Sequence, residues 1–145
     1  MADPRSTPLR ILVVDDNPLL LDLIQEMLKD IGNMLVFTAA DGVQGLEQFE
    51  AVRPDCMVID VNMPGLNGYQ LVRAIRGDPD SAGMPLIILT AMAQDNQQFA
   101  GFAAGVDQYL IKPVTLDVLA AAIQSALAHG EAEREQRWRN LADEI

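Results

Sequence analysis

Three apolar runs in this chain are continuous rather than alternating, and they constrain the fold more than any other feature. Residues 11–14 read ILVV, residues 56–59 read CMVI and residues 86–89 read LIIL. A strand with one face in water alternates apolar and polar side chains, whereas a continuous run indicates a strand covered on both faces. With two further runs, the expected strands are Leu9–Val14, Met34–Thr38, Cys56–Ile59, Leu86–Leu89 and Gln108–Ile111. The chain is therefore predicted to form a buried parallel sheet.

Segments of helical length separate these runs, with apolar residues recurring at steps of three and four. In the first segment Pro18 suits the opening turn, where a missing amide proton costs little, and Gly32 is expected to end the helix. Its apolar stripe consists of Leu20, Leu23, Ile24, Met27, Leu28 and Ile31. The other helices are expected near residues 42–52, 67–76, 94–104 and 116–128. Five strands alternating with five helices predict a doubly wound α/β fold with right-handed crossovers.

The chain divides into an N-terminal segment (1–8), one folded domain (9–129) and a helical tail or linker (130–145). The helix expected at 94–104 contains Gly101, which costs about 1 kcal/mol relative to alanine, so motion is expected there. The tail places Trp138 and Leu141 three residues apart and needs a surface on which to pack them. It is either the end of a stand-alone protein or the start of a linker to a further domain.

The formal net charge of −11 argues against direct binding of nucleic acid or of an anionic membrane surface. The first residues lack the apolar core of a signal peptide, and the apolar runs are too short to span a bilayer. The single cysteine, Cys56, cannot form an internal disulfide and is expected to be a core residue. These features favour a cytoplasmic protein.

Charged and polar residues stand where the predicted strands end. Asp15 and Asp16 follow the first strand, Asp60 the third, Thr90 the fourth and Lys112 the fifth. The carboxyl ends of parallel strands share one edge, so these groups should meet there. Two carboxylates about 4 Å apart repel by roughly 4 kcal/mol at an effective dielectric of 20. Three carboxylates therefore need protons or a divalent cation, and an all-oxygen site suits Mg²⁺.

Such a site is suited to phosphate, because the cation and Lys112 can stabilise the transferring oxygens while a carboxylate attacks. Asp60 is the best candidate, since the following loop, with Pro64, Gly65 and Gly68, fixes the backbone there. Each group also has an ordinary interpretation. Residues 15–18, which read DDNP, could be a helix cap and turn, Thr90 could bond the backbone, and Lys112 could be a solvated charge.

In these motifs the chain resembles the receiver domain of response regulators in two-component signalling. The resemblance rests on the acidic pair after ILVV, on Asp60 in DVNMPGLNG, on Thr90-Ala91 after LIIL and on Lys112-Pro113 after the fifth strand. It spans about Leu9 to Ala128. It implies a flavodoxin-like strand order 2-1-3-4-5 and a phosphorylation-dependent switch with no turnover of outside substrates.

The resemblance also implies roles for the acidic residues. Asp60 would take a phosphoryl group from a histidine kinase or a small phosphodonor. Asp16, Asp60 and the backbone carbonyl of Asn62 would bind Mg²⁺ directly, and Asp15 would act through water.

Four further residues have implied roles near the phosphorylation site. Lys112 would pair with the phosphoryl oxygens, and the peptide bond before Pro113 would be cis. Thr90 would move its hydroxyl onto the phosphate, and Tyr109 would turn inward and report the change on the face of the fourth helix, fifth strand and fifth helix. From its residue type alone, Tyr109 could equally be a half-buried aromatic with a wet hydroxyl.

Three other functions compete with this one. A haloacid-dehalogenase-like phosphatase needs a second Asp two residues after the nucleophile, where this chain has Asn62, and an amide cannot be a general acid. A flavodoxin-like FMN carrier would have a less acidic loop after its first strand. In this chain the loop reads DDNP, and its negative charge would repel the phosphate of FMN. An unphosphorylated interaction module remains open. His129, at the end of the fifth helix, is expected to be solvated rather than a phosphodonor.

The expected partners are a sensor histidine kinase or phosphotransfer protein and a downstream protein target. A homodimer through the face of the fourth helix, fifth strand and fifth helix is a further possibility that the resemblance raises.

Overall fold

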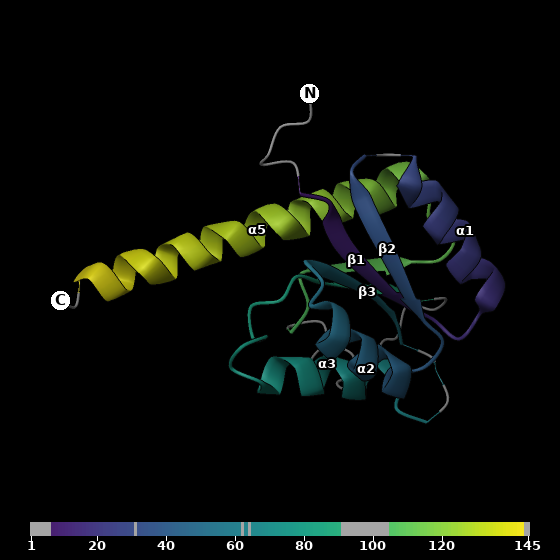
Figure 1. The fold of residues 1–145 in the computed structure, drawn as a ribbon, viewed down its shortest axis with the longest axis horizontal. Coiled ribbons are helices and arrows are strands. Elements are labelled where there is room, and N and C mark those ends of the chain that lie inside the picture. The colour runs from purple at the N-terminus through teal and green to yellow at the C-terminus, as the bar shows by residue number, and fades with distance from the viewer. Residues whose placement is uncertain (1–6, 31, 62, 64, 91–104, 144–145) are drawn as a thin grey trace.

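The computed structural model describes residues 7–30, 32–61, 63, 65–90 and 105–143, without the side chains of 90, 130–138 and 140–143. Its core is one parallel sheet in the order β2-β1-β3-β4-β5 (Figure 1), which confirms the predicted class and strand order. The strands are β1 (Leu9–Val14), β2 (Met34–Ala39), β3 (Cys56–Asp60), β4 (Leu86–Thr90) and β5 (Gln108–Ile111). Each strand boundary lies within one residue of its prediction.

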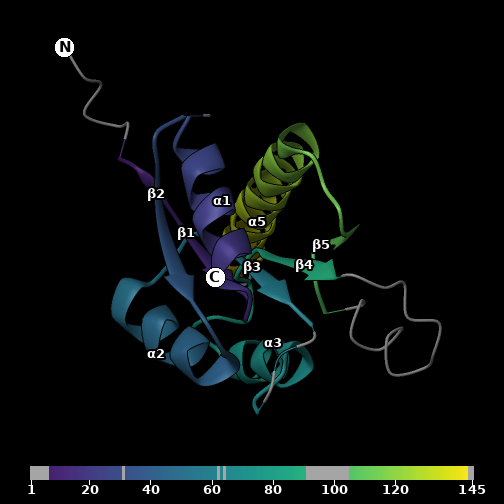
Figure 2. The ribbon, with the colours of Figure 1, turned by 90° about the vertical axis from the view of Figure 1, so that its right-hand side faces the viewer.

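Helices cover both faces of the sheet. They are α1 (Pro18–Lys29), α2 (Gly42–Val52), α3 (Gly68–Gly77) and α5 (Leu116–Asp143). Figure 2 shows α1 and α5 on one side of the sheet and α2 and α3 on the other. The helix expected at 94–104 lies outside the described residues. Because both faces are covered, residues 11–14 of β1, all of β3 and residues 86–89 of β4 are buried, as their continuous apolar runs predict.

Side chains at the helix starts accept hydrogen bonds from otherwise unpaired backbone N–H groups. Asn17 caps α1 and accepts from Leu19 N at 3.1 Å, and Asp41 caps α2. Asn67 and Gln70 form a reciprocal capping box on α3.

The end of α1 differs from the prediction. The helix ends at Lys29, and the N–H of the C-cap residue Asp30 bonds to the carbonyl of Met27 at 3.3 Å, which tightens the last turn. The carbonyl of Gly32 instead accepts from Met34 N at 2.9 Å, in the turn that leads into β2. The expectation that Gly32 ends the helix was therefore wrong by two residues.

The last helix, α5, is 28 residues long, or about 42 Å. Its buried side chains are Leu119, Ala122, Ile123 and Ala126. Its C-terminal part extends away from the sheet and its covering helices (Figure 1). The helix is continuous across residues 129 and 130, where the domain was predicted to end, and that domain limit stays a prediction.

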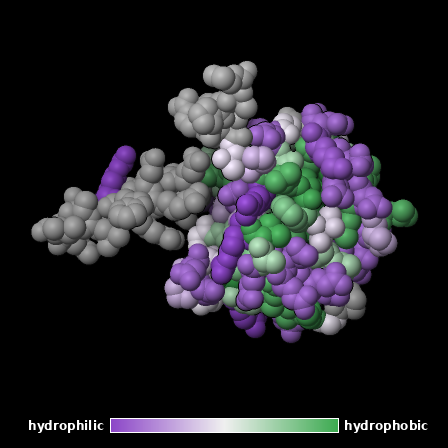
Figure 3. All heavy atoms as spheres, viewed as in Figure 1, coloured by the Kyte–Doolittle hydropathy of each residue, from purple (hydrophilic) through white to green (hydrophobic). Residues whose placement is uncertain are grey.

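The two edges of the sheet are β2 and β5. Most side chains of β2, which reads MLVFTA, are only partly covered, and Leu35 is 48% exposed. Figure 3, which is viewed as Figure 1, shows hydrophobic residues in the middle of the visible surface, bordered by hydrophilic ones. Within the described part of the chain, no helix has the length and hydropathy needed to cross a membrane.

Candidate functional site: an acidic cluster at the carboxyl edge of the sheet

Three carboxylates meet where β1 and β3 end. Val14 of β1 pairs with Ile59 of β3, so the residues that follow them, Asp15 and Asp60, come side by side. Asp16 follows Asp15 on the loop into α1. One carboxylate oxygen of each of the three residues lies within 4.8 Å of the others. The sheet register therefore assembles the acidic cluster that the strand ends predict.

Lys112, just beyond β5, reaches this cluster. Its Nζ lies 2.8 Å from Oδ2 of Asp15 and 3.7 Å from Oδ2 of Asp60. Asp15 and Asp60 are buried, with 1% and 5% of their surface exposed, whereas Asp16 is exposed. Buried like charges at this separation repel strongly, and one ammonium offsets only part of a triple negative charge. The residues present, three carboxylates beside one cation, fit an oxygen-coordinated divalent metal with open positions for water.

The interpretation of residues 15–18 as a helix cap and turn is partly correct. Asn17, rather than either aspartate, is the N-cap of α1. Asp15 accepts a hydrogen bond from the backbone N–H of Asn17 at 2.9 Å through Oδ1, while its Oδ2 accepts from Lys112. One carboxylate thus fixes the loop and also belongs to the charged cluster.

The backbone at Asp60 is held by close packing. A Cβ at Gly68 would lie 2.5 Å from the carbonyl oxygen of Asp60, so only glycine fits there. The N–H of Gly68 donates to the carbonyl of Val61 at 3.2 Å. Gly65, at φ 72°, adopts the left-handed conformation that favours glycine. The first turn of α3 is therefore packed directly on the strand end that carries Asp60.

The remaining predicted site residues are described to different extents. Thr90 ends β4 and pairs with Ile111 of β5, but its side chain and the whole of Asn62 lie outside the described residues. Tyr109 lies on β5 with its side chain partly buried. The Lys112–Pro113 peptide bond is cis.

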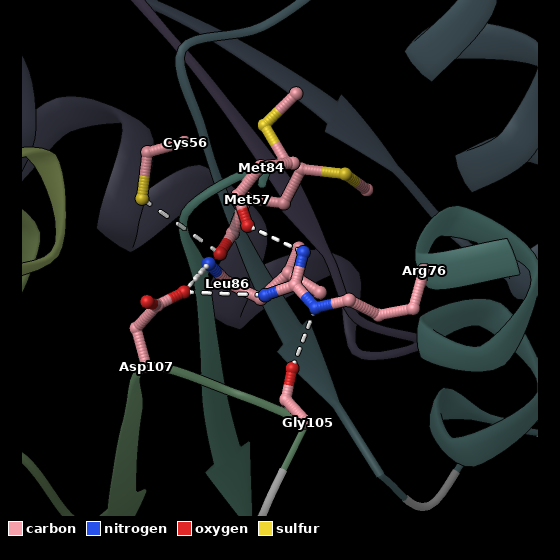
Figure 4. Close-up of polar contacts among 7 residues, drawn as sticks. All are labelled: Cys56, Met57, Arg76, Met84, Leu86, Gly105 and Asp107. Atoms are coloured by element: carbon pink, nitrogen blue, oxygen red, sulfur yellow. Dashed lines mark hydrogen bonds and ion pairs between the residues drawn. The ribbon is translucent and has the colours of Figure 1, made fainter. Parts of the chain in front are cut away.

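A second polar cluster lies at the other end of the sheet, where β4 and β5 begin. Sequence reasoning did not find it. Arg76 donates from Nε to the carbonyl of Gly105 and from Nη1 to that of Met84, both at 2.7 Å (Figure 4). Its Nη2 lies 3.3 Å from Oδ2 of Asp107, which also accepts from Leu86 N at 2.8 Å. Most of these acceptors are main-chain carbonyls, which no sequence motif reveals.

The same end of the sheet also carries a cavity of about 460 Å³, whose lining includes Arg76, Gln108, Ser125 and His129. His129 was expected at a helix end. It is exposed within α5 instead, because the helix continues to Asp143. The cavity lies at the end of the sheet where β4 and β5 begin, whereas the acidic cluster lies where the strands end, so the two are separate.

Cys56 is fully buried at the start of β3, as expected of a core residue. Burial, with the nearby charges of Asp107 and Asp55, raises the pKa of its thiol from 9.0 to about 12. The native protein therefore keeps this proton at pH values at which the unfolded chain releases it. The resulting stability is fully present below pH 9 and is lost as the pH rises toward 12.

We expect the free energy of unfolding to fall between pH 9 and pH 12 by up to about 1.4 kcal/mol per pH unit more in the natural chain than in Cys56→Ala. Urea unfolding of both chains across this range measures the difference. Other ionisable groups are common to the two chains and cancel. Equal pH slopes in the two chains would contradict the raised pKa.

Comparisons with known proteins agree with this geometry. Residues 11–124 match the family described as the response regulator receiver domain. Response regulator MprA of Mycobacterium ulcerans is 37% identical over 133 residues, which cover 92% of this chain and 56% of MprA. The DNA-binding dual master transcriptional regulator RpaA of Synechocystis is 32% identical over 118 residues, covering 81% of this chain and 48% of RpaA. The chain spans about half the length of these curated relatives.

Solved structures are similar over nearly their whole length. Chemotaxis protein CheY4 of Vibrio cholerae superposes with a TM-score of 0.75 at 30% identity, covering 83% of this chain and 99% of CheY4. The receiver domain of sensor histidine kinase PA1611 from Pseudomonas aeruginosa has a TM-score of 0.75 at 33% identity, covering 84% of this chain and 99% of that domain. That structure has a magnesium ion coordinated in its active site cleft.

Proposed function

Because the chain belongs to the response regulator receiver family, we propose that it is a phosphorylation-dependent signalling switch whose phosphoryl acceptor is Asp60. The observation that carries this proposal is the position of Lys112, whose ammonium lies against both Asp15 and Asp60 within a cluster of three carboxylates. Such an arrangement places a nucleophile, a cation and metal ligands around one point. These are the groups that phosphoryl transfer needs.

In the proposed reaction an oxygen of Asp60 attacks the phosphorus of a phosphohistidine on a sensor kinase or phosphotransfer protein. The new O–P bond forms as the P–N bond breaks, and the donor histidine, whose other ring nitrogen carries a proton, leaves as neutral imidazole. Lys112 pairs with the phosphoryl oxygens, since its ammonium already lies at the edge of the cluster. Asp16, Asp60 and the Asn62 carbonyl would hold Mg²⁺, with Asp15 acting through water. The bound Mg²⁺ would offset the negative charge that builds up on the phosphoryl oxygens.

The proposed relay uses Thr90 and Tyr109. Phosphorylation adds about −1.5 to −2 charges and three strong acceptor oxygens at one point, enough to reorder nearby polar groups. Thr90 ends β4, the strand next to the acceptor strand β3, and Tyr109 lies on β5, one strand further away. The change would reach the surface formed by the fourth helix, β5 and α5, where a homodimer could also form.

Exposed leucines beside the acidic edge support docking of a protein donor. Leu19 and Leu23, one turn apart on α1, are 79% and 55% exposed. They lie on the helix that Asn17 caps, next to Asp16. Exposed apolar side chains on one helix face next to a reactive site are typical of a protein contact.

The output is proposed to be a protein contact in the cytoplasm. The net charge of −11 and the single buried cysteine support this proposal. RpaA is by its name a DNA-binding regulator, but direct DNA binding by these 145 residues is not proposed. Nor is turnover of outside substrates, because Asn62 stands where a phosphatase of the aspartyl type would have its general acid; the phosphoryl group would be lost slowly.

The proposal is tested by intact-mass measurement of the chain after incubation with acetyl phosphate. We expect a gain of one phosphoryl group in Mg²⁺ and none in a chelator, because the three carboxylates cannot otherwise approach a phosphate. A failure to gain mass from acetyl phosphate and from a panel of phosphorylated kinases would favour the unphosphorylated interaction module instead.

A further inference from the structure

Tyr69 lies one residue from the packing contact that ties α3 to the acceptor strand. Gly68 contacts the backbone of Asp60 and Val61 so closely that a Cβ there would lie 2.5 Å from the Asp60 carbonyl oxygen. Tyr69 follows it in the first turn of α3. A displacement of the chain at Asp60 would therefore be passed to the backbone of Tyr69 through a rigid contact.

Tyr69 and Tyr109 lie toward the same end of the sheet, because Tyr109 pairs with Ile88 and Ile88 pairs with Ile59, the residue before Asp60. The two side chains pack against the same apolar cluster, on the face of the sheet that α2 and α3 cover. The phenol oxygen of Tyr69 is buried. Burial first, and then the charge of the Tyr109 phenolate, raise the pKa of Tyr69 above its ordinary value of 10.0. Both rings therefore lie on one face of the sheet, toward the end at which Asp60 stands.

We propose that Tyr69 is a positioning residue of the switch, which sets the positions open to Tyr109 and couples α3 to β5. The inference rests on the proposed function and adds to it a connection through the interior beside the one through Thr90. Side chains that pack on one close-packed cluster do not move independently, so we expect an inward turn of Tyr109 to change the packing of Tyr69. Tyr69 touches no reacting atom in this scheme; it acts through Tyr109.

The chain contains two tyrosines, and this makes the test direct. Incorporation of fluorotyrosine gives two fluorine NMR signals, which Tyr69→Phe and Tyr109→Phe assign. On phosphorylation by acetyl phosphate with Mg²⁺, we expect both signals to shift. In Tyr69→Leu, which keeps an apolar side chain but removes the ring, the shift of the Tyr109 signal should fall to about half or less. In Tyr69→Phe, which keeps the ring, that shift should be largely retained.

Intact mass measured on the same samples separates the possible failures. If the phosphoryl group is gained but the Tyr69 signal does not move, or if Tyr69→Leu leaves the Tyr109 shift unchanged, the inference is overturned and the proposed function stands. If no phosphoryl group is gained by the natural chain, the proposed function fails and the inference fails with it. Should Tyr69→Leu not fold, the response of the Tyr69 signal in the natural chain decides alone.

Discussion

The Asp60→Asn variant is expected to gain no phosphoryl group from acetyl phosphate and yet to be more stable than the natural chain. The amide cannot act as the nucleophile, so uptake should be lost entirely. It also removes one negative charge from a cluster in which Asp15 and Asp60 are almost fully buried, while the 2.8 Å contact between Lys112 and Asp15 is kept. In metal-free buffer of low ionic strength we expect a gain of roughly 1 kcal/mol in the free energy of unfolding.

Intact mass and urea unfolding measure the two effects. Asp22→Asn is the matched control, because Asp22 is exposed on α1 outside the acidic cluster, and it should leave phosphoryl uptake unchanged. Added Mg²⁺ should narrow the stability difference, since the cation neutralises the cluster of the natural chain. Uptake by Asp60→Asn equal to that of the control would show that another residue is the acceptor. A large loss of stability would show that Asp60 is held by interactions stronger than the repulsion.

Replacing Arg76 by Ala is expected to lower the free energy of unfolding by about 3 kcal/mol. The substitution leaves the carbonyls of Met84 and Gly105 without the N–H groups that reach them at 2.7 Å. It also leaves Asp107, whose side chain is 15% exposed, without its cation. Charge-assisted hydrogen bonds of this kind are among the stronger ones in proteins, and an unsatisfied buried acceptor costs more than a missing bond.

Arg73→Ala is the control for this variant. Arg73 is exposed on the same helix, so its loss should change stability by less than about 0.5 kcal/mol. At temperatures at which the Arg76→Ala variant is folded, the variant should still gain a phosphoryl group. Arg76 lies where the strands begin, at the end of the sheet opposite the acidic cluster. Equal stabilities for the two variants would show that the contacts in Figure 4 contribute little. Loss of uptake by a folded Arg76→Ala would show that the two ends of the sheet are coupled.

Much of the fold could be predicted from the sequence because the determining signals are local. A run such as ILVV identifies a strand buried on both faces without any knowledge of its neighbours. The helix starts could also be predicted, because a capping side chain such as that of Asn17 accepts hydrogen bonds from backbone N–H groups only two or three residues further along the chain. The end of α1 was misplaced because backbone bonds of the last turn and of the turn into β2 decide it, and neither depends on side-chain type. The position of His129 was misjudged because α5 does not end at Ala128.

The sequence by itself determined which groups stand at the strand ends, because each directly follows its own apolar run. Only the tertiary structure decided their distances. Asp15 and Lys112 are 97 positions apart in the chain, and their 2.8 Å contact depends on the order and register of the strands between them. The same is true of Gly68 against Asp60 and of Arg76 at the carbonyls of Met84 and Gly105. Periodicity indicates the buried face of an element only approximately, since the stripe predicted for α1 included Leu23, which is 55% exposed, and omitted Leu21, which is buried. A contact between distant residues exists only once the sheet has assembled and packed.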